Sequence, residues 1–189
     1  MADETGEVRT KKLDPEAEAR RQLALAQIRQ YPDPVLRMRA NEVEEFDGDV
    51  RQLAERLTHL LRDANGLGLA ATQIGVLRRA FAFLPDVEDE PVVVVNPRFS
   101  VTSEERASDT EGCLSLQGVV IPVERHVSLT LEGQDLDGND VRLELEGLPA
   151  RIAQHELDHL DGVLILDRTT PEARREALGT LRPQPVIVR

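Results

Sequence analysis

The chain has 189 residues, which suits a single domain, and its 40% hydrophobic content is enough for a core of mainly Leu, Val, Ile and Ala. No apolar run is long enough to span a membrane, so we expect no membrane partner. The formal net charge of −12 argues against DNA or RNA as a partner, because contact with a phosphate backbone depends on Lys and Arg.

Residues 1–27 form a charged N-terminal extension, and residues 1–13 lack any pattern and are predicted to be disordered. No apolar segment follows a basic start there, so we predict no signal peptide and a cytoplasmic location. Asp14 and the proline after it are typical of a helix start, and a weak apolar stripe continues this helix to about Ile28. We expect one folded domain over residues 28–182 and a short tail over residues 183–189.

A second helix is predicted to begin at Asp47 and to end near Asn65, because apolar residues recur at helical spacing. The residues of this stripe are Val50, Leu53, Ala54, Leu57, Leu60 and Leu61. The glycine-rich stretch from Gly66 to Gly75 has a Gly-x-Gly-x-x-Ala pattern, but a nucleotide-binding loop of that form follows a strand, not a helix. We interpret the stretch as a loop whose glycines let the main chain of a ligand approach closely.

Short runs with an extended or alternating apolar pattern follow and predict strands. They are residues 81–84, 92–95, 99–102, 119–123, 127–131, 141–145 and 163–166. The turn at 134–140 joins two of these runs as a hairpin, and Thr170-Pro171-Glu172 begins a last helix. Strands in succession, with helices set apart, predict an α+β fold of mainly antiparallel β-sheets, with a helix near each end of the chain.

The helix predicted from Pro149 to Gly162 has the strongest chemical signal. His155 and His159 stand four residues apart, so both imidazoles leave one face of the helix and can share a metal ion. Glu156 lies beside them, where a carboxylate can reach a water molecule on that ion. Apolar residues on more than one side indicate a buried helix, around which we expect the sheets to pack. A His-Glu-x-x-His pattern also recurs by chance, so a pair of solvated histidines stays an open alternative at this point.

A catalytic metal site generally takes three protein ligands and leaves one position for water. The only cysteine in the chain, Cys113, lies in the run from Glu111 to Ser115, and its thiolate would complete a Cys-His-His set. A free cysteine is more commonly a small buried apolar residue. A carboxylate is the competing third ligand, and it would come from Glu111, Asp158 or a more distant acid.

Three blocks of this sequence together resemble the signatures of peptide deformylases. The blocks are Gly66–Gln73, Glu111–Ser115 and Gln154–Gly162, which fit the forms Gly-x-Gly-Leu-Ala-Ala-x-Gln, Glu-Gly-Cys-Leu-Ser and Gln-His-Glu-x-Asp-His-Leu-x-Gly in the family's order. The similarity covers residues 28–168 and is far more specific than a lone His-Glu-x-x-His pattern. It implies a metal-dependent hydrolase that removes the formyl group from the N-terminal N-formylmethionine of nascent peptides and releases formate.

The resemblance also implies roles for individual residues. The implied ligands of one divalent ion per chain are Cys113, His155 and His159. The ion would most commonly be Fe(II), with Zn, Ni or Co able to take the same site. Glu156 would accept the proton of the attacking water and return it to the leaving amine. The side-chain amide of Gln73 and the backbone N–H of Leu114 would stabilise the charge that develops on the formyl oxygen.

By the same resemblance, the peptide substrate would lie extended in the site. Its main chain would pair with the backbone near Leu67, Gly68 and Gly112, and its methionine side chain would enter an apolar pocket. Leu148 and Ile152 are the residues that we expect to line this pocket. Because backbone hydrogen bonds read no side chain, such a site would accept many sequences after the methionine.

The sequence departs from the family pattern at two positions outside the metal chemistry. Gln117 stands where many members have Pro, and Val120 stands where some bacterial members have an Arg near the peptide, so the preference on the peptide side is in doubt. In the family, a basic C-terminal helix can contact the ribosome near the exit tunnel. Arg174, Arg175 and Arg182 allow that contact here, although the acidity of the chain favours an ordinary solvated face.

Two interpretations from other classes stay open. A metalloprotease that uses only the His-Glu-x-x-His helix would need a carboxylate as third ligand and would keep its activity without Cys113. A non-catalytic, metal-stabilised binding protein of this fold would need a fourth protein ligand. His126 is not suitably placed, because its strand pattern predicts that it faces solvent. The presence of Gln73 and Glu156 also disfavours a purely structural site.

Overall fold

The computed structural model describes residues 4–5, 8–9, 14–86 and 89–182, and most of the predicted disordered lead and the whole predicted tail lie outside this part of the chain. The helices are α1 (Pro15–Leu25), α2 (Gly48–Asp63), α3 (Leu148–Leu160) and α4 (Pro171–Leu181), with short 3-10 helices η1 (Pro34–Arg37), η2 (Ala71–Ile74) and η3 (Ile165–Asp167). The strands are β1 (Glu4–Thr5), β2 (Val8–Arg9), β3 (Gly68–Ala70), β4 (Ala80–Phe83), β5 (Val92–Thr102), β6 (Arg106–Gly112), β7 (Val120–His126), β8 (Ser128–Gln134) and β9 (Asp140–Glu146). Within the described residues, no helix is both long and apolar enough to cross a membrane.

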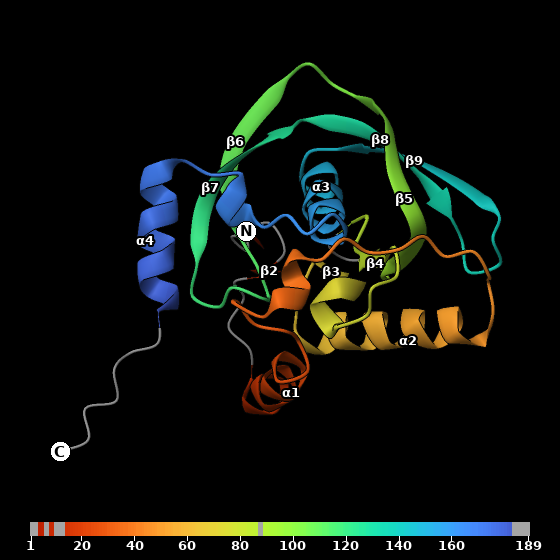
Figure 1. Ribbon diagram of the computed structural model, residues 1–189, viewed down its shortest axis with the longest axis horizontal. Coiled ribbons are helices and arrows are strands. Elements are labelled where there is room, and N and C mark those ends of the chain that lie inside the picture. Colours follow the sequence, from red (N-terminus) through yellow and green to blue (C-terminus); the bar gives the residue numbers. More distant parts are fainter. Residues whose placement is uncertain (1–3, 6–7, 10–13, 87–88, 183–189) are drawn as a thin grey trace.

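The strands form antiparallel sheets that surround α3. One sheet has the strand order β3-β4-β5-β8-β9, a second is the β6-β7 pair, and β1 pairs with β2. Figure 1 shows α3 near the centre, with the long strands arching over it and α2 lying on the opposite side. Helix α3 contacts β3 and β4 of the larger sheet and β7 of the smaller one. The predicted α+β class with mainly antiparallel sheets and a central helix is therefore confirmed.

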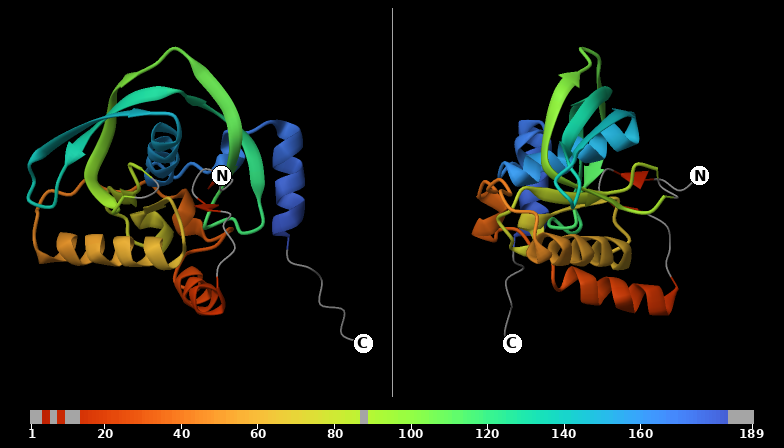
Figure 2. Two further views of the ribbon diagram at one scale, coloured as in Figure 1. Left: turned by 180° about the vertical axis from the view of Figure 1, so that it is seen from behind. Right: turned by 90° about the vertical axis from the view of Figure 1, so that its right-hand side faces the viewer.

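Helices α1 and α2 cover the lower face of the molecule and lie side by side in both views of Figure 2. The side chain of Asp14 caps α1 and that of Asp47 caps α2, as a carboxylate before a first turn predicts. The six apolar residues predicted for the second helix are all buried. Ala24 and Leu25 of α1 belong to the same core cluster as five of these residues, all except Ala54, and as Leu114.

The central helix begins and ends where the sequence predicts. A proline occupies its first turn, and Gly162 follows it with a φ of 74°. A Cβ atom at position 162 would lie 2.6 Å from the carbonyl oxygen of Arg37, so no larger residue fits there without a backbone shift. Both histidines of the helix are about 1% exposed, which places their imidazoles inside the molecule.

Three predictions of local structure are wrong. Residues 4–5 and 8–9, which were predicted to be disordered, form the antiparallel pair of β1 and β2. Residues 163–166 do not form a strand, because the chain closes the 3-10 helix η3 there. The Asp167 N–H donates to the Leu164 carbonyl and the Arg168 N–H to the Ile165 carbonyl, while the Asp167 side chain accepts from the Leu164 N–H. A short apolar run that is buried on all sides has the same sequence pattern whether it forms a strand or a 3-10 helix. The runs 92–95 and 99–102 belong to the single strand β5, whose pairing with β8 is interrupted by irregularities.

Candidate active site

Two histidines of α3 and the cysteine that follows β6 meet inside the molecule. Ligand atoms of Cys113, His155 and His159 all lie within 4.8 Å of one another, and Cys113 Sγ is 3.4 Å from His159 Nε2. All three side chains are buried. One thiolate and two imidazoles suit Fe, Zn, Ni or Co rather than Mg or Ca, which prefer oxygen ligands. The donor set fits a divalent transition metal, and three protein ligands are the number that catalytic sites use.

The local fold explains how Cys113 reaches the helix. Strands β6 and β7 pair up to Gly112 and Val120, and the chain turns immediately after that pair. The N–H of Leu116 donates to the carbonyl of Cys113 at 3.0 Å, which closes the turn and directs the cysteine toward α3. The arrangement joins side chains that are more than 40 positions apart in the sequence.

Glu156 lies against the backbone of the glycine-rich stretch. Its side chain is fully buried, and a Cβ atom added to Gly68 would lie 2.1 Å from its Oε1 atom and 2.7 Å from its Cδ atom. No side chain at position 68 can coexist with the carboxylate in this position. The glycine at this position lets β3 lie next to the carboxylate of α3.

The side chain of Gln73 is held at both ends. Its Oε1 atom accepts the Ala70 N–H at 2.7 Å, which fixes which end of the amide carries the nitrogen. Its Nε2 atom donates to Ser115 Oγ at 3.2 Å and lies 3.9 Å from Cys113 Sγ. The amide N–H group thus faces the cysteine turn. The residue is fully buried, so its orientation is set by these partners rather than by solvent.

A short segment before η1 fixes the backbone around this amide. The side chain of Gln30 donates to the carbonyl of Leu114 at 2.9 Å, and the Tyr31 N–H donates to the carbonyl of Ser115 at 2.9 Å. The Arg29 N–H donates to the carbonyl of Gln73 at 2.7 Å. Sequence reasoning missed these contacts, because nothing in a glutamine before Tyr-Pro indicates a partner 84 positions away. The segment holds the peptide groups of both motifs in one orientation.

A buried carboxylate orients the first histidine of α3. Glu111 Oε2 is 2.9 Å from His155 Nδ1, which leaves His155 Nε2 for the metal ligand cluster. Arg125 donates to both oxygens of Glu111 at 2.9 and 3.0 Å, and Arg151 donates to it at 2.8 Å. Burial alone raises the pKa of the Glu111 carboxyl, but the hydrogen bonds from His155 and Arg125 outweigh burial and hold that pKa well below its usual range.

The charge cluster continues along α3 to a second carboxylate. Asp158 accepts from Arg125 at 2.5 Å and from Arg168 at 2.6 and 3.0 Å. Burial raises the pKa of Asp158, and its bonds to Arg168 and Arg125 reverse that effect and lower it. Glu111 and Asp158, the carboxylates considered as third metal ligand, are therefore engaged by arginines and lie outside the ligand cluster. Sequence reasoning missed the role of the three arginines that hold these carboxylates, Arg125, Arg151 and Arg168.

The alternating pattern of β7 could have indicated that Arg125 is buried. Alternate residues of this strand are buried, and the series Ile121, Val123, Arg125 lies on the inner face. A charge at an inner position needs a buried partner, and Glu111 lies in the neighbouring strand. His126, which was predicted to face solvent, is half-buried, and its Nδ1 atom is 2.6 Å from the carbonyl oxygen of Ser103.

The residues expected to contact a peptide come from several elements of the fold. Leu67 and Ile152 are almost fully buried and belong to one apolar cluster, against which the partly buried Leu148 packs. Gly68 lies in β3, which is the edge strand of the larger sheet. Gly112 ends β6, immediately before the cysteine turn. Strand β3 contacts α3, which carries both histidines, so Gly68 lies on an element next to the histidine helix.

Comparison with known proteins gives one consistent family. The profile of the polypeptide deformylase family matches residues 25–175. A peptide deformylase of Desulforudis audaxviator is 43% identical over 154 residues, which cover 82% of this chain and 99% of the relative. Peptide deformylase 1 of Corynebacterium glutamicum is 42% identical over 162 residues, which cover 85% and 96%.

Solved structures agree with the sequence comparison. A peptide deformylase from Synechococcus elongatus in complex with actinonin has a TM-score of 0.77 and 36% identity, over 81% of this chain and 85% of that chain. The peptide deformylase from Thermotoga maritima has a TM-score of 0.73 and 42% identity, over 76% and 97%. The similarity includes 85% and 97% of the other two chains, so it extends well beyond the short motifs.

Proposed function

Because the chain belongs to the polypeptide deformylase family, we propose that it removes the formyl group from the N-formylmethionine of newly made polypeptides and releases formate. The observation that carries this proposal is the convergence of the three sequence motifs on one buried site. Gln73 comes from the first motif, Cys113 from the second, and His155, Glu156 and His159 from the third. The chain is accordingly a hydrolase that acts on a linear amide.

We propose that Cys113, His155 and His159 hold one divalent ion, with Fe(II) as the ion in the cell. The clustering of their ligand atoms and the soft thiolate donor support a metal from the series Fe, Co, Ni and Zn. A cation at this position supplies Lewis acidity, which lowers the pKa of water and polarises a carbonyl oxygen. The protein contributes the rigid donor set, because Glu111 fixes the ring of His155 through Nδ1.

We assign the proton transfers to Glu156. Its carboxylate accepts one proton from the attacking water as the water oxygen bonds to the formyl carbon. As the bond between that carbon and the methionine nitrogen breaks, the same proton passes from Glu156 to the nitrogen, which gives a neutral amine and formic acid. The acid then loses the second proton of the attacking water to the amine or to solvent, so the product leaves as formate. The buried position of Glu156 beside Gly68 supports this role, since the carboxylate faces the place where a peptide backbone can approach.

Gln73 and Leu114 are our candidates for stabilising the negative charge on the formyl oxygen. The amide nitrogen of Gln73 faces the cysteine turn, and its carbonyl end is anchored on Ala70. The Leu114 N–H belongs to the peptide group of the Cys113 carbonyl, and that carbonyl accepts from the Leu116 N–H at 3.0 Å, so this donor is also held. Donors that are already oriented need no rearrangement as charge develops, and loss of one such donor typically costs about 3 kcal/mol of transition-state stabilisation.

We propose that the substrate lies extended between the edge of β3 and Gly112. Backbone pairing at Leu67, Gly68 and Gly112 would hold it without reading its side chains. The apolar cluster of Leu67 and Ile152, with Leu148 packed on it, would receive the methionine side chain. Selectivity for N-formylmethionine then comes from this apolar wall and from the small space left for the formyl group.

Formate release from an N-formyl-Met tripeptide tests the reaction. The protein is purified without oxygen, loaded with Fe(II) and compared with a chelator-treated sample. We expect one formate per peptide from the loaded protein and none after chelation. Glu156→Gln should retain the metal and lose turnover, whereas Glu146→Gln, at an exposed position on β9, should behave as the wild type. Absence of formate from a sample shown to contain metal would reject the proposal.

Cys113→Ala distinguishes this reaction from that of a His-Glu-x-x-His metalloprotease. In the deformylase, the variant loses a ligand and should therefore lose both metal and turnover. In the protease, a carboxylate would replace the thiolate and activity would survive. The engagement of Glu111 and Asp158 by arginines supports the first outcome. A metal content equal to that of the wild type would remove Cys113 from the ligand set.

We also propose that the protein acts in the cytoplasm, where formylated chains emerge from ribosomes, and that α4 can contact the ribosome. Arg175 on α4 is exposed, while Arg174 pairs with Asp167 at 3.7 Å. The net charge of −12 opposes broad contact with RNA, so only a local basic face would serve. Co-sedimentation with ribosomes, lost in Arg175→Glu, tests this contact, and no sedimentation of the wild type would reject it.

A further inference from the structure

Helix α1 is an addition to the matched family region that nevertheless reaches the cysteine turn. The family profile begins at residue 25, which is the last residue of α1. Ala24 and Leu25 are 2% and 3% exposed and belong to the core cluster that contains Leu114. A helix packed in this way has a fixed position relative to the proposed active site. Arg21, one turn before Leu25, therefore lies at a fixed place beside the cysteine turn.

A cavity of about 310 Å³ separates α1 from the cysteine turn. Its lining residues are Arg21, Leu25, Gly112, Cys113, Leu114, Leu116, Gln117, Gly118, Val119 and Val120. The cavity thus contacts both Gly112, where we place the peptide backbone, and Cys113. Among the described residues that line it, Arg21 is the only one of the Asp, Glu, Lys and Arg types. The walls provided by Gln117 and Val120 are uncharged.

The guanidinium of Arg21 retains capacity to bind an anion. Its side chain is 25% exposed, and its Nη1 atom lies 3.5 Å from a carboxylate oxygen of Glu18 one turn earlier. Glu18 also accepts a hydrogen bond from Gln22 at 2.7 Å. An ion pair of this kind between partly exposed residues contributes little, and it uses one nitrogen of a group that has five N–H donors. A carboxylate entering the cavity can therefore compete with Glu18.

We infer that Arg21 makes this cavity a subsite for an acidic side chain, Asp or Glu, among the first residues after the methionine of the formylated peptide. The inference rests on the proposed function, because that function places the peptide along Gly112. On a chain with a net charge of −12, an acidic peptide meets general repulsion, and one arginine beside the peptide path offsets that repulsion locally. The subsite therefore sets which nascent chains are processed fastest.

Charge-matched peptides test the subsite. The series is formyl-Met-Ala-Xaa-Ala-amide with Glu, Gln or Lys as Xaa, and the amide cap removes the C-terminal carboxylate. We expect kcat/KM to favour Glu over Lys by about tenfold, mainly through KM, because attraction and repulsion both enter the ratio. The preference should shrink between about 0.02 M and about 0.5 M salt. The uncapped Gln peptide, run in parallel, shows whether a terminal carboxylate can fill the same place.

Variants of the helix show whether Arg21 is responsible. Arg21→Gln should remove the preference, Arg21→Lys should keep most of it, and Arg21→Glu should reverse it in favour of the Lys peptide. Arg20→Gln is the matched control, because Arg20 lies on the same helix and is exposed. Equal rates for the Glu and Lys peptides in the wild type, or a preference that survives Arg21→Gln, would overturn the inference.

A binding measurement separates this inference from the proposed reaction. The same peptides without the formyl group are titrated into the wild type and into Arg21→Gln, and the dissociation constants are measured by calorimetry. Tighter binding of the Glu peptide by the wild type alone supports the subsite even if no formate is released. Equal dissociation constants for the Glu and Lys peptides would reject the subsite even if formate release is confirmed.

Discussion

Two clusters of arginines and carboxylates in this molecule have similar distances and opposite environments. The inner charge cluster lies behind the histidines of α3 and consists of Glu111, Arg125, Arg151, Asp158 and Arg168. The outer charge cluster lies on the surface of β5, β8 and β9 and consists of Arg98, Glu132, Arg142 and Glu144. N–O distances are 2.5 to 3.0 Å in the inner cluster and 2.8 to 3.2 Å in the outer one. The side chain of Arg125 is 5% exposed, whereas that of Arg142 is 56% exposed.

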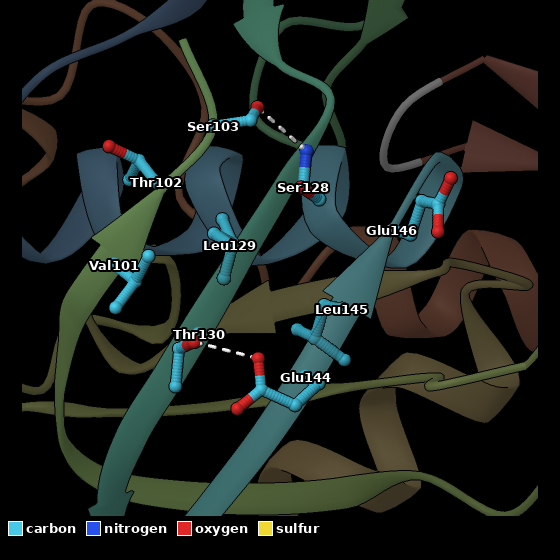
Figure 3. Close-up of a pocket in the computed structure, with 9 residues that line it drawn as sticks. All are labelled: Val101, Thr102, Ser103, Ser128, Leu129, Thr130, Glu144, Leu145 and Glu146. Carbon is cyan, nitrogen blue, oxygen red and sulfur yellow. Dashed lines mark hydrogen bonds between the residues drawn. The ribbon is translucent and has the colours of Figure 1, made fainter. Parts of the chain in front are cut away.

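The difference shows that distance alone does not decide what an ion pair does. In the outer cluster, water solvates each charge whether or not the pair forms, so the pair contributes little. Figure 3 shows Glu144 on this face, where it accepts a hydrogen bond from Thr130 at 2.7 Å beside a shallow pocket of about 340 Å³. In the inner cluster, Arg168 reaches solvent, but water is excluded from Glu111, Arg125 and Arg151, so a charge there that loses its partner stays uncompensated. Each buried charge of the inner cluster therefore needs its partner, and the arginines that hold Glu111 keep its carboxylate in place against His155 Nδ1.

Removal of Arg125 is the strongest test of this comparison. Arg125→Met leaves Glu111 with Arg151 and Asp158 with Arg168, and both carboxylates stay buried. Breaking a buried pair from one side typically destabilises a protein by about 3–5 kcal/mol, and we expect a loss of that size. Urea unfolding of the metal-free protein measures it. A decrease in the free energy of unfolding of less than about 1 kcal/mol would mean that these buried pairs contribute no more than exposed ion pairs do.

Glu111→Gln tests the functional half of the comparison. The substitution keeps an oxygen near His155 Nδ1 but removes the negative charge that favours the metal-binding orientation of the ring. Loss of such a partner typically lowers metal affinity by about 10–100-fold, and we expect a fall in that range. Competition with a chromophoric chelator measures it with Zn or Co. Glu132→Gln in the outer cluster is the matched control. An equal change in metal affinity in the two variants would show that the contact of Glu111 with His155 does not determine the affinity.

Asp167 lies between the two extremes and gives a prediction about pH. Burial raises the pKa of this half-exposed carboxyl, but Arg37, the Leu164 N–H and Arg174 together lower it below its usual value. A lowered pKa in the folded state stabilises the protein above the unfolded pKa of about 3.9, and this stabilisation is lost as the pH falls through the folded pKa.

Asp167→Asn should therefore be less stable than the wild type at neutral pH, and the difference should narrow as the pH falls below about 4. Urea midpoints at a series of pH values between neutral and acid give the comparison directly. A difference that stays constant across that range would mean that the charge of Asp167 is not the source of its contribution, and that the hydrogen bond to the Leu164 N–H is sufficient.

Much of the fold follows from local chemistry in the sequence. Capping carboxylates such as Asp47 mark where helices begin, and the alternation of β9 predicts its polar outer face with Arg142 and Glu144. The strand β6 was not predicted, because five of its seven residues are exposed and it has no apolar alternation. Its position comes from pairing with β7, which is a property of the three-dimensional structure.

The candidate site divides in the same way. Helical spacing was enough to name His155, His159 and Glu156 from the sequence, and the resemblance of the motifs to those of the family added Gln73, Cys113 and Leu114. The residues that orient them could not be named, because Gln30 contacts Leu114 across 84 positions and Arg125 contacts Asp158 across 33. A single charged residue in an alternating strand is read as exposed unless its partner is known, and the partner lies on another element.

The smallest expected effect comes from the outer cluster. Arg142→Ala removes the contacts to Glu132 and Glu144, but both carboxylates remain in water and need no other partner. We therefore expect no measurable change in the urea midpoint at about 0.15 M salt, where exposed charges are largely screened. A loss comparable to that of Arg125→Met would contradict the comparison, because it would show that exposure does not separate the two clusters. If Arg142→Ala leaves the urea midpoint unchanged and Arg125→Met lowers it, burial is the property that makes an arginine–carboxylate pair important for stability and for the position of His155.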